Sequence, residues 1–391
     1  MATGTTEAPK TGKGLEDVVA AQSTISDVDG DTGILLYRGY AVADLADNAT
    51  FEEVACLLLE GKLPTRSELS AFKDDLTAHR TLPEPVLDVL RRLPKTTPPM
   101  AALRSALSVL GSFDPDGEDI SQITKTDKSR LDRERKKVRR LVAQVAAVVA
   151  AHHRIRQGLE PVAPDPALGH AANFLYAVSG KKPTAAEERA FDLCLVLHAE
   201  HGLNASTFAA RVTIATLSDM HSAVVSGIGA LRGPLHGGAN EQVMVMLKKI
   251  PDPANAGKWV EDALARGEKI MGMGHRVYKV YDPRARILKE WSRRLGEEKG
   301  EPHWFQMSDI IEKAVNAKKP NIHPNVDFYS ATVYHHLGIP TDLFTPIFAV
   351  SRIAGWCAHV LEQLADNRLI RPESEYIGPR GLKVAPIDQR S

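Results

Sequence analysis

Thr184-Ala-Ala-Glu-Glu-Arg-Ala-Phe-Asp-Leu-Cys-Leu-Val-Leu-His-Ala-Glu200 is the stretch that sets the fold class of this chain. It opens with a capping box, because the side chains of Thr184 and Glu187 can satisfy backbone groups that a helix start leaves free. Apolar residues then recur at helical spacing, so the stretch predicts a helix over residues 185–200. A chain with many such segments is typical of a mostly α protein.

The other start and stop signals along the chain are also those of helices. Gly61 and Gly111 are expected helix stops, because glycine readily takes the left-handed conformation that ends many helices. Capping boxes at Thr50 with Glu53 and at Thr65 with Glu68 open two further segments, and other helices are expected at residues 85–92, 99–110, 138–156, 168–178, 219–231, 240–250, 256–266, 283–295, 308–317, 326–337 and 346–365. The exception is a short N-terminal β-hairpin, predicted from residues 23–28 and 33–38 around Asp29-Gly30-Asp31-Thr32.

Length and charge limit the classes of function. A chain of 391 residues exceeds what a single hydrophobic core usually fills, so two domains are expected, with the glycine-rich residues 226–238 as a hinge. Lys plus Arg (49) equals Asp plus Glu (49), so no overall charge attracts the chain to nucleic acid or to a membrane. Any anionic ligand must then be held by a local cluster of cations.

Cysteine usage and the N-terminus predict the compartment. Cys56, Cys194 and Cys357 lie in apolar helical settings without CxxC or zinc spacing, so we expect reduced core residues. The N-terminal residues are polar and lack the apolar segment of a signal peptide. The longest apolar run, near residues 141–151, is too short to span a bilayer. We expect a cytoplasmic protein with a disordered leader at residues 1–13.

A basic run covers residues 125–140, where Lys and Arg far outnumber Asp127, Asp132 and Glu134. A noncatalytic nucleic-acid binder is one hypothesis for it. The run lacks the interleaved aromatic residues or glycines of such binders, so a solvated helix face or a surface loop is the favoured interpretation.

A polar cluster, His198-Ala-Glu-His201-Gly-Leu-Asn204, ends the helix predicted at 185–200. It has three interpretations: a lining that hydrogen-bonds an organic anion, a metal site, or histidines satisfied in the core. The spacing H-E-x-x-H, which places two zinc ligands one helical turn apart, is absent, so the first interpretation is favoured. A metal-dependent hydrolase that uses His198, Glu200 and His201 remains the alternative from another class.

A histidine on a tight turn follows in Gly233-Pro-Leu-His236-Gly-Gly-Ala-Asn240, just ahead of a predicted helix. The positive end of the helix dipole disfavours imidazolium there. A neutral His236 can donate a hydrogen bond to a carbonyl that becomes an enolate. The alternative is a histidine that caps its own turn.

A ligand loop is predicted at Met271-Gly-Met-Gly-His-Arg-Val-Tyr-Lys-Val-Tyr-Asp-Pro-Arg284. Glycines let backbone approach a ligand, whereas the stretch lacks the third glycine and the βαβ pattern of a dinucleotide site. Lys279 is placed to serve a phosphate, and His275 with Arg284 to hold a smaller anion.

Two further charged residues stand at predicted helices. Asp327, in Asn325-Val-Asp-Phe-Tyr-Ser, lies at a helix start, where the dipole is expected to keep it ionised as a general base requires. A simple helix cap is the alternative. Arg352 interrupts an apolar helix, and Arg371 follows on a later loop. A buried Arg needs an anion, either a ligand carboxylate or a structural Asp or Glu.

Together these motifs closely resemble the citrate synthase family, in its shorter bacterial and archaeal form. The motifs occur in the family's order: Leu197-His-Ala-Glu-His-Gly-Leu-Asn-Ala-Ser-Thr-Phe, Gly233-Pro-Leu-His-Gly-Gly-Ala-Asn, Gly272-Met-Gly-His-Arg-Val-Tyr and Asn325-Val-Asp-Phe-Tyr-Ser. The resemblance implies a helical homodimer in which residues 14–236 and 339–391 form a large domain and residues 237–338 a smaller lid. It also implies condensation of acetyl-CoA with oxaloacetate to citrate and CoA, without cofactor or metal.

The resemblance assigns roles residue by residue. Asp327 matches the base, His236 the donor to the enolate, and His275 the residue that polarises the oxaloacetate ketone. The remaining matches are oxaloacetate ligands at His201, Arg284 and Arg352, an arginine that reaches the neighbouring subunit's site at Arg371, and CoA contacts at Lys269, Ile270, Met271, Gly272, Met273 and Lys279. The 2-methylcitrate synthases, which take propionyl-CoA, share these catalytic positions, so the acyl chain stays open. Residues 1–13 and 125–140 match no family motif.

Overall fold

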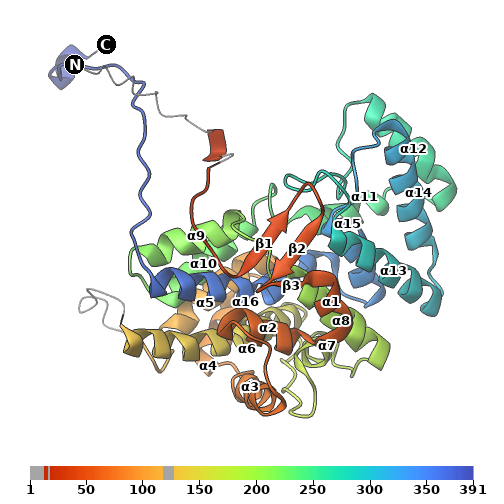
Figure 1. The fold of residues 1–391 in the computed structure, drawn as a ribbon, viewed down its shortest axis with the longest axis horizontal. Helices are drawn as coiled ribbons and strands as arrows, with labels where there is room; N and C mark the ends of the chain where they lie inside the picture. Colours follow the sequence, from red (N-terminus) through yellow and green to blue (C-terminus); the bar gives the residue numbers. More distant parts are fainter. Residues whose placement is uncertain (1–12, 16–17, 118–126, 391) are drawn as a thin grey trace.

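A computed structural model describes residues 13–15, 18–117 and 127–390 (Figure 1). The α-helices are α1 (Val42–Asn48), α2 (Phe51–Glu60), α3 (Arg66–Ala78), α4 (Glu84–Arg92), α5 (Pro99–Gly111), α6 (Lys128–Arg156), α7 (His170–Ser179), α8 (Ala185–His198), α9 (Ala205–Ala215), α10 (Met220–Leu231), α11 (Ala239–Leu247), α12 (Pro253–Ala265), α13 (Pro283–Glu298), α14 (His303–Lys318), α15 (Val326–His336) and α16 (Phe344–Ala365). Short 3-10 helices are η1 (Lys13–Leu15), η3 (Thr341–Leu343) and η4 (Ile387–Gln389). The predicted mostly α class is confirmed. The expected leader falls almost wholly outside the described residues.

The predicted N-terminal hairpin is present and carries a third strand. β1 (Ser26–Asp29) pairs antiparallel with β2 (Ile34–Tyr37), and β2 pairs with the short β3 (Tyr40–Ala41). The Asp29 side chain accepts hydrogen bonds from the backbone N–H groups of Asp31 and Thr32, which closes the turn between β1 and β2.

Capping explains where several helices begin. At Thr50, Thr65 and Thr184 the predicted capping boxes are confirmed, since each side chain accepts from the N3 backbone and each N3 glutamate accepts in return. Gly61 ends α2 in the left-handed conformation as predicted. Gly111 differs, because it is the last residue of α5 and Ser112 takes the cap position.

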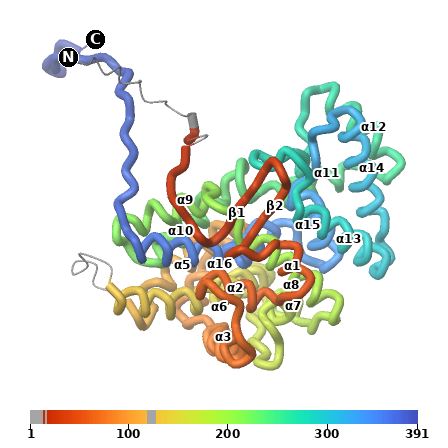
Figure 2. The backbone as a smooth tube through the Cα atoms, in the orientation of Figure 1, coloured from red at the N-terminus to blue at the C-terminus, as the bar shows by residue number. Residues whose placement is uncertain are grey.

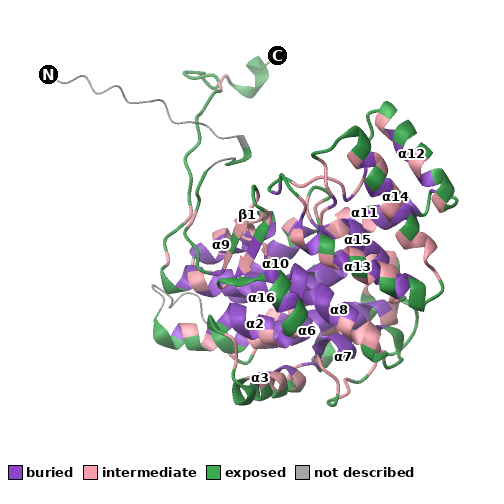
Figure 3. Cartoon of the chain, turned by 45° about the vertical axis from the view of Figure 1, so that its right-hand side comes forward, coloured by how far each residue is buried: buried purple, intermediate pink, exposed green. Residues whose placement is uncertain are grey.

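Helix α16 is the centre of the core, packed by α2, α6, α8, α9 and α10 (Figure 3). The segment Thr341–Ala365 is, by length and composition, a candidate to cross a membrane, yet its apolar window is entirely buried inside the protein. It is also longer than the run at 141–151 that the sequence suggested as the longest. Complete burial against other helices explains its apolar composition without a bilayer.

Helices α11 to α15 gather at one side of the molecule, at the right of Figure 1. α12 packs on α14, α13 on α15, and α11 joins this group to α16. The group lies within the expected lid, residues 237–338, whose boundaries remain a prediction.

The interpretation of the basic run as a solvated face was partly wrong. Helix α6 begins at Lys128, and several of its charged side chains are buried rather than solvated. Lys137 donates to Glu134 over 3.1 Å, and Arg140 pairs with Asp114 over 2.7 Å. Buried partners of opposite charge thus hold this end of α6 in the core. Residues 118–126 lie outside the described chain.

Two helices were missed because other signals masked them. α9 follows Asn204, whose side chain caps the backbone of Ser206 and Thr207, but the motif had been assigned to a ligand site. α1 is short, and its N-terminus has no side-chain cap. α1, at seven residues, is too short for a helix period to be recognised.

The C-terminal tail extends from the end of α16 away from the helical body (Figure 2). It exposes apolar side chains, among them Leu369 (57 %), Ile377 (92 %) and Val384 (88 %).

Candidate active site

His236, His275 and Asp327 come from three separate segments of the fold. His236 lies in the turn between α10 and α11, His275 between α12 and α13, and Asp327 in the first turn of α15. Burial shifts the pKa of each, and Arg352 acts on His236 and Asp327 while Arg284 acts on His275 and Asp327. The ring of Phe348 lies 6.4 Å from that of His236 and 4.7 Å from the guanidinium of Arg352, and Asn325 joins the backbone N–H of Asp327 to the oxygen of Gly274, next to His275. These contacts link the three residues in one charged neighbourhood.

His275 is held in one tautomer by its own loop. Its Nδ1 accepts hydrogen bonds from the backbone N–H groups of Val277 at 2.9 Å and Tyr278 at 3.1 Å. An acceptor nitrogen carries no proton, so the neutral ring bears its proton on Nε2. Burial, with a contribution from Arg284, lowers the pKa of His275 to about 4, which keeps the ring neutral. His275 is therefore a neutral Nε2–H donor.

His201 faces this donor. The ring centroids of His201 and His275 lie 5.3 Å apart, and His201 Nε2 lies 3.1 Å from the hydroxyl of Tyr278. Burial first, and then the charge of Arg284, holds the pKa of His201 well below its ordinary value. Two neutral imidazoles and the Tyr278 phenol thus lie in contact with one another.

His236 is fixed by a serine that was not predicted. Its Nε2 lies 2.8 Å from Ser206 Oγ, and that hydroxyl accepts from Trp356 Nε1 at 3.0 Å and donates to Asn204 Oδ1 at 2.7 Å. Burial, with a smaller effect of Arg352, lowers the pKa of His236 to about 4. The predicted neutral state stands, but burial rather than a helix dipole is its main cause.

Asp327 differs from the expectation of a carboxylate kept ionised by the helix dipole. Burial raises its pKa from 3.8 to about 7, although Arg284 and Arg352 oppose the rise and Asp282 adds to it. Desolvation outweighs the helix dipole and the two arginines, because Oδ1 has no hydrogen-bond partner within the described chain to stabilise the charge. A base that titrates near neutrality is the result.

The two buried arginines have different partners. Arg284 is paired with Asp282 over 2.8 Å. Arg352 donates through Nε to the backbone oxygen of His198 at 2.7 Å and stacks over Phe348, but no carboxylate of the described residues lies within ion-pair distance of it. Burial lowers the pKa of Arg352 to about 10. A buried arginine needs an anion, either a structural carboxylate or a ligand. Arg284 has the structural carboxylate of Asp282, whereas for Arg352 a ligand is the explanation that is left.

The metal interpretation of the polar cluster is not supported by its geometry. His198 Nδ1 lies 2.8 Å from the backbone oxygen of Cys194, and Glu200 contacts His359 at 3.0 Å and Ser26 at 2.9 Å, whereas His201 turns to Tyr278. The three candidate ligands therefore point to separate partners. No group of three or more His, Cys, Asp or Glu side chains suited to a metal ion occurs among the described residues.

The tip of the β1–β2 hairpin supports the loop of His275. The backbone N–H of Lys279 donates to the oxygen of Gly30 at 2.9 Å, and its ammonium lies 2.8 Å from Asp31. A Cβ at Gly30 would lie 2.1 Å from the backbone oxygen of Val277, so only glycine fits. Lys279, expected near a phosphate, is thus engaged with the hairpin.

The segment expected to border CoA runs past the start of α15. Ile270 and Gly272 are buried, Met271 and Met273 are half-buried, and Lys269 is exposed. Gly272 has φ 75°, and a Cβ there would meet Phe328 at 2.9 Å. This glycine is required for packing against α15 rather than for approach to a ligand.

Arg371 does not join the other predicted site residues. It lies exposed in the C-terminal tail, and in the described structure it has no ion pair with a carboxylate of this chain. A role at this chain's own site would require the tail to fold back.

The structure adds residues that sequence reasoning missed. Ser206 and Tyr278 lie within the quoted motifs, so their proximity to histidines gave a weak signal. Phe348 and Trp356 are ordinary core aromatics by pattern, and only the fold brings them against Arg352 and Ser206.

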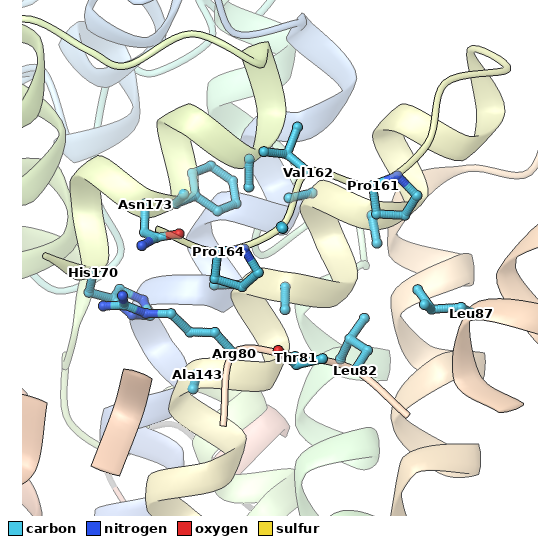
Figure 4. Close-up of a pocket in the computed structure, with 17 residues that line it drawn as sticks. Arg80, Thr81, Leu82, Leu87, Ala143, Pro161, Val162, Pro164, His170 and Asn173 are labelled. Atoms are coloured by element: carbon cyan, nitrogen blue, oxygen red, sulfur yellow. The ribbon is translucent and has the colours of Figure 1, made fainter. Parts of the chain in front are cut away.

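A separate cavity of about 260 Å³ lies between α6, α7 and the connection before α7 (Figure 4). Its walls are mostly apolar, with Arg80, His170 and Asn173 as polar members. None of the candidate site residues lines it, so it has no part in the site described here.

The fold and the site together define an acid–base site with fixed positive charge, built from one titrating carboxyl, neutral imidazoles and two buried arginines. Comparison with known proteins then gives the family. A family model described as "Citrate synthase, C-terminal domain" matches residues 14–373. This chain belongs to the citrate synthase family.

Individual relatives agree over nearly the whole chain. The chain is 51 % identical to "Citrate synthase" of Haloferax volcanii, covering 97 % of this chain and 98 % of that protein. It is 42 % identical to "2-methylcitrate synthase" of Shewanella oneidensis, over 97 % and 98 %. A citrate synthase of Thermoplasma acidophilum, solved with carboxymethyl coenzyme A and oxaloacetate, superposes with a TM-score of 0.87 at 35 % identity, over 97 % and 99 %.

Proposed function

We propose that this enzyme condenses acetyl-CoA with oxaloacetate and water to give citrate and CoA. The observation that carries the proposal is the partly accessible Asp327, whose pKa burial raises to about 7, set beside two arginines and two neutral histidines. A base of this pKa suits proton abstraction at neutral pH. The family and the ligands of the Thermoplasma acidophilum structure support the choice of substrates.

In the first step, Asp327 removes a proton from the acetyl methyl group while His236 donates a hydrogen bond to the thioester oxygen. The C–H electron pair moves into the enolate, so the developing charge needs a preorganised donor. In the described structure the Ser206 hydroxyl donates to Asn204 Oδ1, so it must turn to His236 Nε2 when substrate binds for the imidazole proton to lie on Nδ1. That tautomer makes His236 Nδ1 the donor to the enolate.

In the second step, the enolate carbon attacks the oxaloacetate ketone, and a C–C bond forms as the ketone becomes an alkoxide. His275 donates a hydrogen bond from Nε2 to that oxygen, because its Nδ1 accepts from the backbone and so leaves the ring proton on Nε2. Water then cleaves the thioester of citryl-CoA, which releases citrate and the CoA thiol. We assign the carboxylates of oxaloacetate to Arg352 and Arg284, with His201 as a further hydrogen-bonding partner.

Assembly and substrate contacts beyond this cleft are part of the same proposal. We infer a homodimer in which the apolar C-terminal tail packs on a second copy and Arg371 enters its site; the exposure of the tail supports this. Residues 269–273 would border CoA. Lys279 would reach a phosphate only by leaving Asp31. The lid at 237–338 and a cytoplasmic location, which the free, buried cysteines support, complete the proposal.

The 2-methylcitrate synthase activity is the less favoured alternative, because the more similar relatives are citrate synthases. The test is release of free thiol from acetyl-CoA or propionyl-CoA, with and without oxaloacetate. We expect release that requires oxaloacetate, that is faster with acetyl-CoA and that EDTA leaves unchanged. Preference for propionyl-CoA would select the alternative, and release without oxaloacetate would contradict both.

A further inference from the structure

We propose that Asp282 is a positioning residue, whose carboxylate joins the anion-binding Arg284 to the helix that carries Asp327 and so fixes base and substrate relative to each other. The inference rests on the proposed function and deepens it. Nothing in the sequence motifs drew attention to this residue, because an aspartate before Pro283 is a common helix start.

The contacts of Asp282 exceed what a helix cap needs. Oδ1 accepts from the backbone N–H and from Nε of Arg284, each at 3.0 Å. Oδ2 accepts from Nη2 of Arg284 at 2.8 Å and from the backbone N–H of Val326 at 3.1 Å. The side chain is 1 % exposed. One carboxylate therefore caps α13, holds a guanidinium in bidentate fashion and ties down the first residue of α15.

Another Asp-Pro helix start in this chain provides the comparison. Asp252, before Pro253, caps α12 by accepting from the backbone N–H of Ala254 at 2.8 Å, and it is exposed. Its carboxylate contacts neither an arginine nor a second helix in the described structure. Capping alone thus requires neither burial nor the additional partners of Asp282.

The bidentate contact also decides which edge of Arg284 can meet a ligand. Nε and Nη2 are occupied by Asp282, and Nη1 has no hydrogen-bond partner in the part of the chain that the structure describes. A substrate carboxylate would therefore meet Nη1. Since Val326 directly precedes Asp327, the same aspartate sets the distance between that carboxylate and the base.

Asn325 supplies the matching connection on the other side. Its Nδ2 donates to the oxygen of Gly274 at 2.8 Å, next to His275, and its Oδ1 accepts from the N–H of Asp327 at 3.0 Å. The start of α15 is thus tied to the loop of His275 by Asn325 and to Arg284 by Asp282. Loss of either connection would leave one reacting partner free to shift.

Charge gives Asp282 a second, measurable effect. The charges of Arg284, Asp282 and Arg352 shift the pKa of Asp327. Tyr334, on α15, is neutral, and burial first and then the charge of Asp327 raise its pKa in turn. Burial is the main reason that the pKa of Asp327 is raised, and the negative charge of Asp282 raises it further. Removing that charge must move the titration of Asp327 to lower pH.

The test compares Asp282→Asn, Asp282→Glu and the control Asp252→Asn by steady-state thiol release across pH. Asparagine caps helices as well as aspartate but cannot accept through both side-chain atoms. We expect Asp282→Asn to lower kcat about tenfold or more, since small displacements at a reacting centre have effects of this size. The oxaloacetate KM should change much less, because two effects of the substitution oppose each other. Arg284 is held less firmly, which weakens binding, but it also loses the negative charge of Asp282, which competes with oxaloacetate for it.

The pH profile separates positioning from a merely structural role. In Asp282→Asn the acid limb of kcat/KM should move to lower pH. Asp282→Glu keeps the negative charge but moves the carboxylate by one methylene. Its kcat should therefore fall, while the acid limb of kcat/KM stays at the wild-type pH. Asp252→Asn should resemble the wild type in both respects.

Several results would overturn the inference. They are wild-type kcat in either Asp282 variant, an unmoved acid limb in folded Asp282→Asn, or equal effects of the Asp282 and Asp252 substitutions. If Asp282→Asn does not fold, Asp282→Glu decides alone through its kcat. Failure of the proposed function would look different, because the wild type itself would then release no oxaloacetate-dependent thiol.

Discussion

Replacing Asp327 by asparagine is expected to make the enzyme more stable at alkaline pH while removing its activity. Burial raises the pKa of Asp327 from 3.8 to about 7, a difference of about 3 pH units at about 1.4 kcal/mol each, so ionising it in the folded protein costs about 4 kcal/mol. Partial access to solvent makes this an upper limit. A comparison of Asp327→Asn with the wild type therefore reports how much stability the ionised base costs the folded enzyme.

The sign of the pH dependence follows from proton binding. Between pH 4 and 7 the folded state holds the Asp327 proton and the unfolded state does not, so this group's contribution to stability falls as pH rises through that window. We expect Asp327→Asn to match the wild type near pH 4. At pH 8 it should exceed the wild type by up to about 4 kcal/mol in the free energy of unfolding.

Two assays on the same preparations measure both consequences. Denaturant unfolding at pH 5 and pH 8 gives the stability difference, and thiol release gives turnover, which should fall by about two to four decades. In the wild type, kcat/KM should fall about tenfold per pH unit below pH 7. A variant that is less stable than the wild type at pH 8, or that turns over normally, would refute this reasoning.

Three further substitutions test other parts of the site. Arg352→Ala should weaken oxaloacetate binding by about 2–5 kcal/mol, because it leaves a carboxylate without its partner; unchanged affinity by calorimetry would make this arginine structural. Gly30→Ala should lower kcat, because its Cβ would lie 2.1 Å from the oxygen of Val277 and displace the His275 loop, whereas Gly229→Ala, which meets nothing within 4 Å and has no positive φ, serves as the steric control. Equal activities would show that the hairpin is dispensable. Ser206→Ala should reduce kcat about tenfold or more through the tautomer of His236, with little change in the oxaloacetate KM; an equal rise in KM would indicate general disruption.

Local signals predicted much of the helical fold. Capping boxes at Thr50, Thr65 and Thr184 located three helix starts, because a side chain that satisfies an end N–H is a short-range property. Residues 128–137 of α6 escaped prediction because a buried cation there, Arg130, donates to backbone oxygens distant in sequence, those of Leu217 and Ser218. No local pattern reveals such a partner.

In the candidate site, too, the motifs identified the residues, whereas the environment of those residues depends on the fold. His236, His275, Arg284, Arg352 and Asp327 were named from motifs, and the fold places them in one charged neighbourhood. The sequence could not reveal that desolvation outweighs the helix dipole at Asp327, since desolvation depends on every element that surrounds the group.

Contacts between distant loops were equally hidden. Lys279 looked like a phosphate ligand, but the hairpin residue Asp31 engages it. Asp282 was assigned no role, yet its second oxygen reaches Val326 on another helix. Both depend on tertiary structure, which a motif of consecutive residues does not contain.

The most direct test of a single reacting centre is a double-mutant cycle of His236→Ala and Asp327→Asn, read as kcat for thiol release. Residues that act on the same step are strongly non-additive, so the double variant should be about as slow as the slower single variant. If the two losses in rate simply multiply, the histidine and the aspartate act independently, and the mechanism that assigns both to one step is contradicted.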